Sequence, residues 1–378
     1  MRFSRGVEAA AGSLLSIQVL RAIAALAVTV DHMSREFGLK LHAAAPIPPS
    51  VAAYGGAGVD LFFVISGFIM VYASDRLFGQ RGGPAHFAMR RCVRIIPLYW
   101  AASVILLAFV LRRYPDLASA DLSPSSIAAS FLFIPWAKPD GTIQPLHAVG
   151  WTLNYEMFFY LVFSVALLAP RRAAVFAVTG FFAVLVALGQ LLAPLPVPLA
   201  YWSDPVICEF AYGLWIAVLY REGVRLPRWA SAPLVLAGIA TATILSFVMP
   251  GPRCVQFGIP AALVVAGLVL VDRPRRASRA WRALGLLGDA SYALYLLHPF
   301  AMTLPRPLYP YLSGLPGAAW LYALALLISA VTVAVLAHLL FEKPLTRRLQ
   351  PLGSAVFPPP QNRVAVAAGR QSGAQALP

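Results

Sequence analysis

Two of the ionisable side chains inside the first long apolar segment of this sequence, residues 14–34, could take part in chemistry. They are Arg21 and His32, eleven residues apart. At about 100° and about 1.5 Å per residue, this spacing places both on one helix face, roughly 16 Å apart along the axis. A central arginine facing lipid is disfavoured by about 3 kcal/mol on the mildest scale, so Arg21 predicts a buried or wet surrounding. His32 offers a base near neutral pH, although a histidine at a helix end can also be an ordinary interfacial residue.

Carboxylates occupy two further apolar segments. Asp60 lies in a stretch of glycines and small residues that also contains Ser66, a composition that favours close helix packing. Glu156 lies four residues after Thr152, so the two share a helix face. Packing explains neither carboxylate, and ionisable residues within a membrane usually mark functional sites. Further polar or aromatic residues of the second stretch are Trp151 and Asn154, of which Trp151 could be an interface anchor.

Two more groups of polar residues complete the candidates. The first is an arginine cluster, Arg90, Arg91 and Arg94. Guanidinium groups bind phosphates through charge-assisted, bidentate hydrogen bonds, but cytoplasmic loops of membrane proteins carry arginines in any case. The second group places three residues on adjacent turns of one helix: Ser291, Tyr295 and His298. His298 could act in chemistry or simply bond to a neighbouring helix.

The composition predicts a membrane protein. Hydrophobic residues make up 60% of the 378 positions and charged residues 12%, with a mean hydropathy of +0.73. This balance excludes an ordinary soluble domain, and the net charge of +15 indicates basic loops rather than a nucleic-acid partner. A spanning helix needs about 20 apolar residues. The segments that qualify, or nearly so, are 14–34, 56–73, 95–113, 150–169, 173–193, 204–220, 232–249, 255–271, 286–304 and 319–341.

Loop charges predict the orientation of this bundle of about ten helices. With both termini in the cytoplasm, 22 Lys and Arg residues lie inside and 7 outside, whereas eight or nine spans would break the alternation. We therefore expect an all-α, multi-pass membrane domain over residues 1–350 and a disordered cytoplasmic tail over 351–378. Residues 114–149 should form an external lid or re-entrant segment.

The cysteines and the N-terminus add little chemistry. Cys92, Cys208 and Cys254 are too widely spaced for a metal-ligand set, so we interpret them as packing residues and predict no metal site. A cleaved signal peptide is disfavoured, because Arg21 and the Asp31-His32 pair interrupt the apolar core that it would need.

Six short motifs in order give the sequence a family resemblance. They are Arg21-x10-His32, Phe62-Phe63-x-x-Ser66-Gly67-Phe68, Arg91-x-x-Arg94-x-x-Pro97, Trp151-Thr152-x-x-x-Glu156-x-x-x-Tyr160, Ser291-Tyr292-x-x-Tyr295-Leu296-x-His298 and Phe341-Glu342-Lys343-Pro344. Each is weak alone. Together they resemble the membrane acyltransferase-3 family over about residues 15–345, particularly its branch that O-acetylates bacterial exopolysaccharides.

The resemblance implies a chemistry for these residues. It implies an enzyme of the bacterial inner membrane that takes an acyl group, typically acetyl, from cytoplasmic acetyl-coenzyme A to a glycan hydroxyl, with no permanently bound cofactor. It also implies that His32 is the catalytic group, supported by Arg21. The arginines could hold the phosphates of coenzyme A. His32 could accept the hydroxyl proton or could itself be acylated, and the sequence leaves both open.

Other functions predict features that the sequence does not display. A transporter or flippase should contain inverted repeats with broken helices in matching halves. A glycan polymerase or other membrane glycosyltransferase should present a larger external catalytic loop than residues 114–149. A non-catalytic sensor would leave the ordered set of motifs unexplained.

Overall fold

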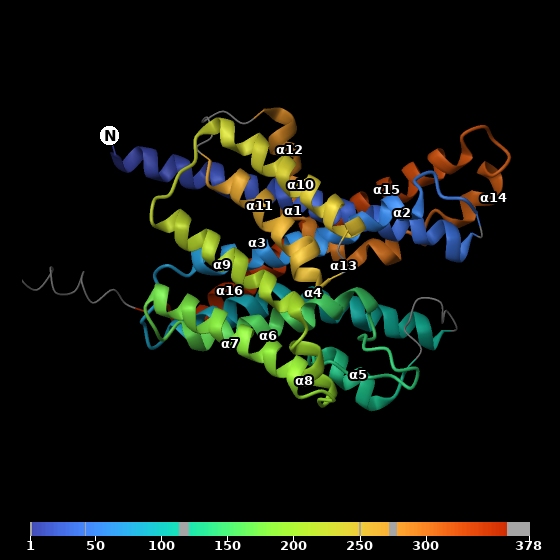
Figure 1. The fold of residues 1–378 in the computed structure, drawn as a ribbon. Helices are drawn as coiled ribbons and strands as arrows, with labels where there is room; N and C mark the ends of the chain where they lie inside the picture. The colour runs from blue at the N-terminus through green and yellow to red at the C-terminus, as the bar shows by residue number, and fades with distance from the viewer. Residues whose placement is uncertain (1, 42, 113–120, 249–250, 272–277, 361–378) are drawn as a thin grey trace, which may run out of the picture.

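The computed structural model describes residues 2–41, 43–112, 121–248, 251–271 and 278–360, which form a bundle of helices (Figure 1). Within these ranges the only β-pairing is two isolated bridges, Ala137 with Ile143 and Leu226 with Val271. The main helices are α1 (Arg2–Lys40), α3 (Ala57–Ala73), α4 (Gly83–Leu111), α5 (Pro124–Phe131), α6 (Trp151–Ala166), α7 (Arg171–Leu191), α9 (Cys208–Arg221), α10 (Ser231–Val248), α11 (Ile259–Val269), α12 (Arg279–Asp289), α13 (Ser291–Ala301), α15 (Ala318–Ala337) and α16 (Lys343–Val356).

The prediction of an all-helical membrane protein is confirmed. Six helical stretches in the described part of the chain are long and apolar enough to cross a bilayer by themselves. These six are Leu15–Gly38, Pro49–Ala73, Gly83–Leu111, Arg171–Leu191, Arg228–Ser246 and Ala318–Val356. Large apolar side chains such as Leu161, Phe176 and Leu236 are more than half exposed, as expected for a surface that faces lipid.

Three helix boundaries differ from those expected. The arginine cluster was expected in a loop but lies inside α4, which begins at Gly83 and carries Pro84 in its first turn, where proline is tolerated. The span expected at 286–304 is two helices, α12 and α13, because the helix breaks at Ala290. Helix α16 continues past residue 350 to Val356, and residues 361–378 lie outside the described part, so the disordered tail stays a prediction.

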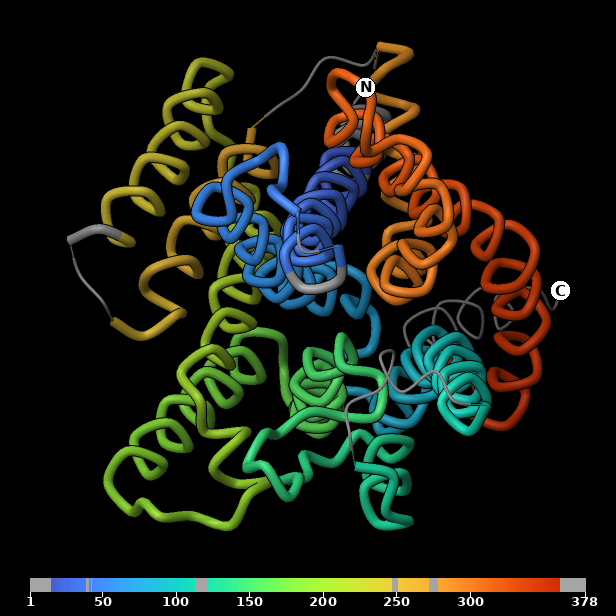
Figure 2. Tube along the Cα trace, turned by 90° about the vertical axis from the view of Figure 1, so that its right-hand side faces the viewer, coloured from blue at the N-terminus to red at the C-terminus, as the bar shows by residue number. Residues whose placement is uncertain are grey.

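Helix α1 lies inside the bundle and packs against α3, α12 and α13 (Figure 2). Two glycines allow the close approach, because a Cβ at Gly58 of α3 would lie 2.4 Å from the carbonyl oxygen of Ala24. A Cβ at Gly288 of α12 would lie 1.9 Å from the carbonyl oxygen of Gln18. Since only glycine fits at such contacts, α1 is fixed between its neighbours along the part that carries Arg21.

The segment expected to form an external lid is folded from residue 121 onward. It contains α5, and the Ser130 hydroxyl accepts a hydrogen bond from the Leu146 amide at 2.8 Å. The Tyr99 hydroxyl of α4 donates to the Ser130 carbonyl at 3.1 Å. These bonds hold residues 121–150 against α4, next to the start of α6. Residues 114–120 lie outside the described part.

Candidate active site

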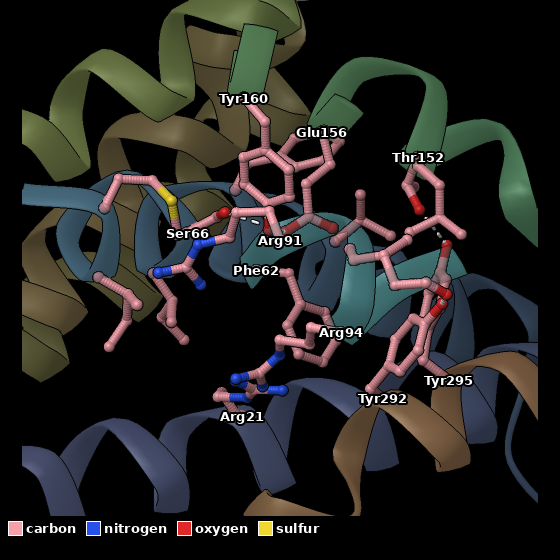
Figure 3. Close-up of a pocket in the computed structure, with 17 residues that line it drawn as sticks. Arg21, Phe62, Ser66, Arg91, Arg94, Thr152, Glu156, Tyr160, Tyr292 and Tyr295 are labelled. Atoms are coloured by element: carbon pink, nitrogen blue, oxygen red, sulfur yellow. Dashed lines mark hydrogen bonds between the residues drawn. The ribbon is translucent and has the colours of Figure 1, made fainter. Parts of the chain in front are cut away.

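A pocket lies between α1, α3, α4, α6 and α13 (Figure 3). The polar residues that line it come from segments far apart in the sequence. They are Arg21, Ser66, Arg91, Arg94, Thr152, Glu156, Tyr160, Tyr292 and Tyr295.

Three arginines point into this pocket from two helices (Figure 3). Arg91 and Arg94 are three residues apart on α4 and therefore share a face. The Arg21 Nε donates to the Ser291 hydroxyl at 3.0 Å. The Arg91 guanidinium lies 5.3 Å from the ring centre of Phe87 and 5.8 Å from that of Tyr160, and its buried Nε has no hydrogen-bond partner within the described residues.

The pocket carries an excess of positive charge. Three guanidinium groups face one carboxylate, Glu156, and among the described residues no direct ion pair joins Glu156 to any of them. In a low-dielectric surrounding, unpaired charges are costly unless a ligand compensates them. Guanidinium forks prefer carboxylate and phosphate groups. The pocket is therefore suited to a polyanion.

Glu156 is held in place by two hydroxyl groups. Its Oε1 accepts hydrogen bonds from Ser66 Oγ at 3.0 Å and from the Tyr160 hydroxyl. Ser66 approaches from α3, which is packed tightly on α9: a Cβ at Gly67 would lie 2.0 Å from the Phe210 carbonyl oxygen. The carboxylate is thus oriented by side chains of α3 and α6, and α9 holds α3 in place.

A line of side chains connects the pocket with His32. The hydroxyls of Thr152 and Tyr295 lie 3.0 Å apart, and the Tyr295 ring lies 6.3 Å from the ring of His298, measured between centroids. The rings of His298 and His32 are 4.8 Å apart in an edge-to-face arrangement. Arg21 and His32 therefore lie on one face of α1, as predicted, and this face packs on α13. Arg21 contacts Ser291 of that helix, and His32 contacts His298.

The His32 ring is fixed in one tautomer by its own helix. Its Nδ1 lies 3.0 Å from the carbonyl oxygen of Val28. Because a carbonyl only accepts, Nδ1 carries the hydrogen and Nε2 carries a lone pair. His32 is only partly buried, so this lone pair can act as a base toward a group beside the ring.

Comparison with known proteins identifies the family to which these site residues belong. The acyltransferase domain family (Acyl_transf_3) matches residues 14–339, which is most of the chain and all of the site. The chain belongs to this family. With the helical, apolar fold, this makes it a membrane O-acyltransferase, as the motifs predicted.

Three relatives are informative. Exopolysaccharide production protein ExoZ of Rhizobium meliloti (strain 1021) is 36% identical over 301 residues, 78% of this chain and 90% of that protein. Acyltransferase MdmB of Streptomyces mycarofaciens is 26% identical, covering 91% of this chain and 95% of its own length. Peptidoglycan O-acetyltransferase OatA of Listeria monocytogenes is 24% identical, covering 77% of this chain and 50% of its own length. No solved structure matches the chain.

Several candidate residues of this acyltransferase lie away from the pocket. Arg90 is exposed, because one helical step of about 100° turns it away from Arg91. Asp60 is fully buried but pairs with Arg253, at 2.8 and 2.7 Å, rather than with His32. Trp151 and Asn154 use their carbonyl oxygens to accept bonds from the side chains of Tyr201 and Trp202, and neither lines the pocket.

Glu156 lines the same pocket as the arginines of α4. The reason is geometric. Arg91 and Arg94 are raised into the bundle by the helical start of α4, whereas a loop would have kept them at the surface.

Two buried residues in this region were not predicted. Glu209, fully buried near Asp60 and Arg253, was detectable because it is an acid inside an apolar span. His147 is buried, and its Nε2 lies 2.7 Å from the Leu296 carbonyl oxygen of α13. It belongs to no polar pattern in the sequence, so only the fold reveals it.

Proposed function

We propose that this enzyme transfers an acyl group, typically acetyl, from cytoplasmic acetyl-coenzyme A to a hydroxyl of an exported or cell-surface polysaccharide. The observation that best supports this proposal is the pocket with three arginines and one carboxylate. Its Tyr295 side chain connects it with the rings of His298 and His32. Relatives named for exopolysaccharide production and for peptidoglycan O-acetylation support a glycan acceptor.

The donor enters from the arginine side in this proposal. Coenzyme A is polyanionic, and Arg91 and Arg94 bind its phosphates through charge-assisted hydrogen bonds. Its long flexible arm then passes Arg21 and brings the thioester toward Tyr295. Glu156 keeps the pocket from being purely cationic, which allows the product to leave again.

His32 performs the proton transfer. The acceptor oxygen attacks the acyl carbon, the hydroxyl proton moves to Nε2 of His32, and the carbon–sulfur bond breaks with its electron pair leaving on sulfur. A positioned base of this kind contributes about 10²–10⁴-fold to the rate. Acylation of His32 followed by transfer to the glycan uses the same nitrogen and remains the second route.

The membrane arrangement is part of the proposal. It has ten spans in the bacterial inner membrane, both termini in the cytoplasm and α1 running outward, so that His32 is on the acceptor side. Alkaline phosphatase fused after residue 125 should be active and fused after residue 80 inactive. The reverse pattern would contradict this orientation.

The function is tested on the host's glycan. Deleting the gene should remove an acyl mass from the polysaccharide, measured by mass spectrometry, and complementation with the wild-type gene should restore it. A variant His32→Gln at equal expression should not restore it. Unchanged acylation together with a lost or stalled glycan would instead favour the transporter or flippase.

A further inference from the structure

Among the described residues, His298 stands out by a buried nitrogen without a hydrogen-bond partner. The side chain is fully buried, and Nδ1 lies 3.1 Å from the carbonyl oxygen of Leu294. Nδ1 must therefore donate, which leaves a lone pair on Nε2. Within the described residues this Nε2 has no partner. Buried acceptors are rarely left unpaired, because the folded state then loses their hydration without compensation.

The neighbouring His32 explains why Nε2 of His298 has no hydrogen-bond donor. The two rings are in edge-to-face contact, with 4.8 Å between centroids and 68° between planes. Both histidines use Nδ1 to donate to their own helices, so both present a lone pair at Nε2. Two lone pairs cannot form a hydrogen bond. Once His32 is protonated at Nε2, however, it has a donor, and His298 has an acceptor that no other described residue uses.

We propose that His298 is a positioning residue that accepts a hydrogen bond from His32 only while His32 is protonated. This rests on the proposed role of His32 as the base. The proton from the acceptor hydroxyl reaches Nε2 of His32 as the new carbon–oxygen bond forms and the carbon–sulfur bond breaks. His298 shares that proton until water takes it up. An interaction that forms only in the charged state lowers the barrier rather than merely binding substrate.

The chain offers a matched control in His147. This histidine is also buried and also packs on α13, with its ring 5.1 Å from that of Phe300. Its Nε2 is already engaged with the Leu296 carbonyl oxygen, so it cannot serve His32 in the same way. Glutamine can keep that donor, so His147→Gln tests the effect of altering a buried histidine nearby.

Two substitutions at position 298 distinguish a side chain that accepts a hydrogen bond from one that only packs. In His298→Gln an amide oxygen can take the place of Nε2 and still accept a bond. In His298→Asn the shorter amide can keep the bond to Leu294 but leaves no acceptor near His32. We expect kcat to fall about 10- to 100-fold in the asparagine variant, the usual contribution of a hydrogen bond to a charged group, and clearly less in the glutamine variant. KM for the donor should not change in either variant.

The assay uses membrane vesicles, acetyl-coenzyme A and the host's exopolysaccharide after alkaline removal of its ester groups. His147→Gln should retain the wild-type kcat. Equal kcat in the asparagine and glutamine variants, or a loss confined to KM, overturns the role of His298. Full activity of His32→Gln would instead overturn the proposed function. If neither variant inserts, ¹⁵N spectra of histidine-labelled wild-type protein decide: a resting His298 Nε2 that is protonated or hydrogen-bonded overturns the inference.

Discussion

Replacing both pocket arginines of α4 by lysine should weaken donor binding without disturbing insertion. Arg91→Lys with Arg94→Lys keeps both positive charges, and therefore the charge pattern that sets topology. Lysine lacks the planar fork that forms two parallel bonds and that, at Arg91, lies over the rings of Phe87 and Tyr160. If each arginine loses about 1–2 kcal/mol, the pair loses about 2–4 kcal/mol, or roughly a 30- to 1,000-fold rise in Kd.

The assay is equilibrium binding of labelled acetyl-coenzyme A to the purified protein in detergent, with the membrane-inserted amount measured in parallel. Arg90→Lys is the matched control, because Arg90 is adjacent in sequence but exposed and outside the pocket. It should bind like the wild type. A double variant that binds donor as tightly as Arg90→Lys would refute the reasoning, and the α4 arginines would then serve topology alone.

Two further predictions concern stability, measured as the melting temperature in detergent. Gly213→Ala should destabilise the fold by at least about 2 kcal/mol, because its Cβ would lie 1.9 Å from the Val64 carbonyl oxygen and force α3 and α9 apart. Gly180→Ala on α7, where a Cβ would meet no atom within 4 Å, is the control and should not lower the melting temperature. Equal melting temperatures of the two variants would contradict the close packing. Arg253→Ala should cost about 3–5 kcal/mol, because it leaves Asp60 buried without its partner, whereas a change near zero would mean that Asp60 is neutral or hydrated.

The helical, membrane-embedded fold was predictable because apolar length dominates the behaviour of a chain in a bilayer. The break at Ala290 was missed because Leu286 and Leu287 before it and the apolar residues of α13 after it favour one span, although Gly288 and Asp289 interrupt the apolar stretch. The helical start of α4 was missed for a related reason. A basic cluster satisfies the rule for cytoplasmic loops whether it is a loop or the first turns of a helix.

The site was only partly predictable. Helical spacing correctly put Arg21 and His32 on one face of α1, and Thr152 and Glu156 on one face of α6. Spacing says nothing about which helices meet, so the pairing of Asp60 with Arg253, 193 positions away, could not be inferred. The unpaired nitrogen of His298 is likewise a property of packing rather than of sequence.

In the proposed function, His32 is the base for transfer of an acyl group from a donor on one side of the membrane to an acceptor on the other. The most direct measurement uses proteoliposomes with acetyl-labelled coenzyme A on the arginine side and de-esterified exopolysaccharide on the opposite side. The wild-type protein should transfer label to the polysaccharide, and His32→Gln should bind the donor equally well but transfer none. Transfer by His32→Gln at the wild-type rate would contradict the account and make Glu156 the leading candidate for the base.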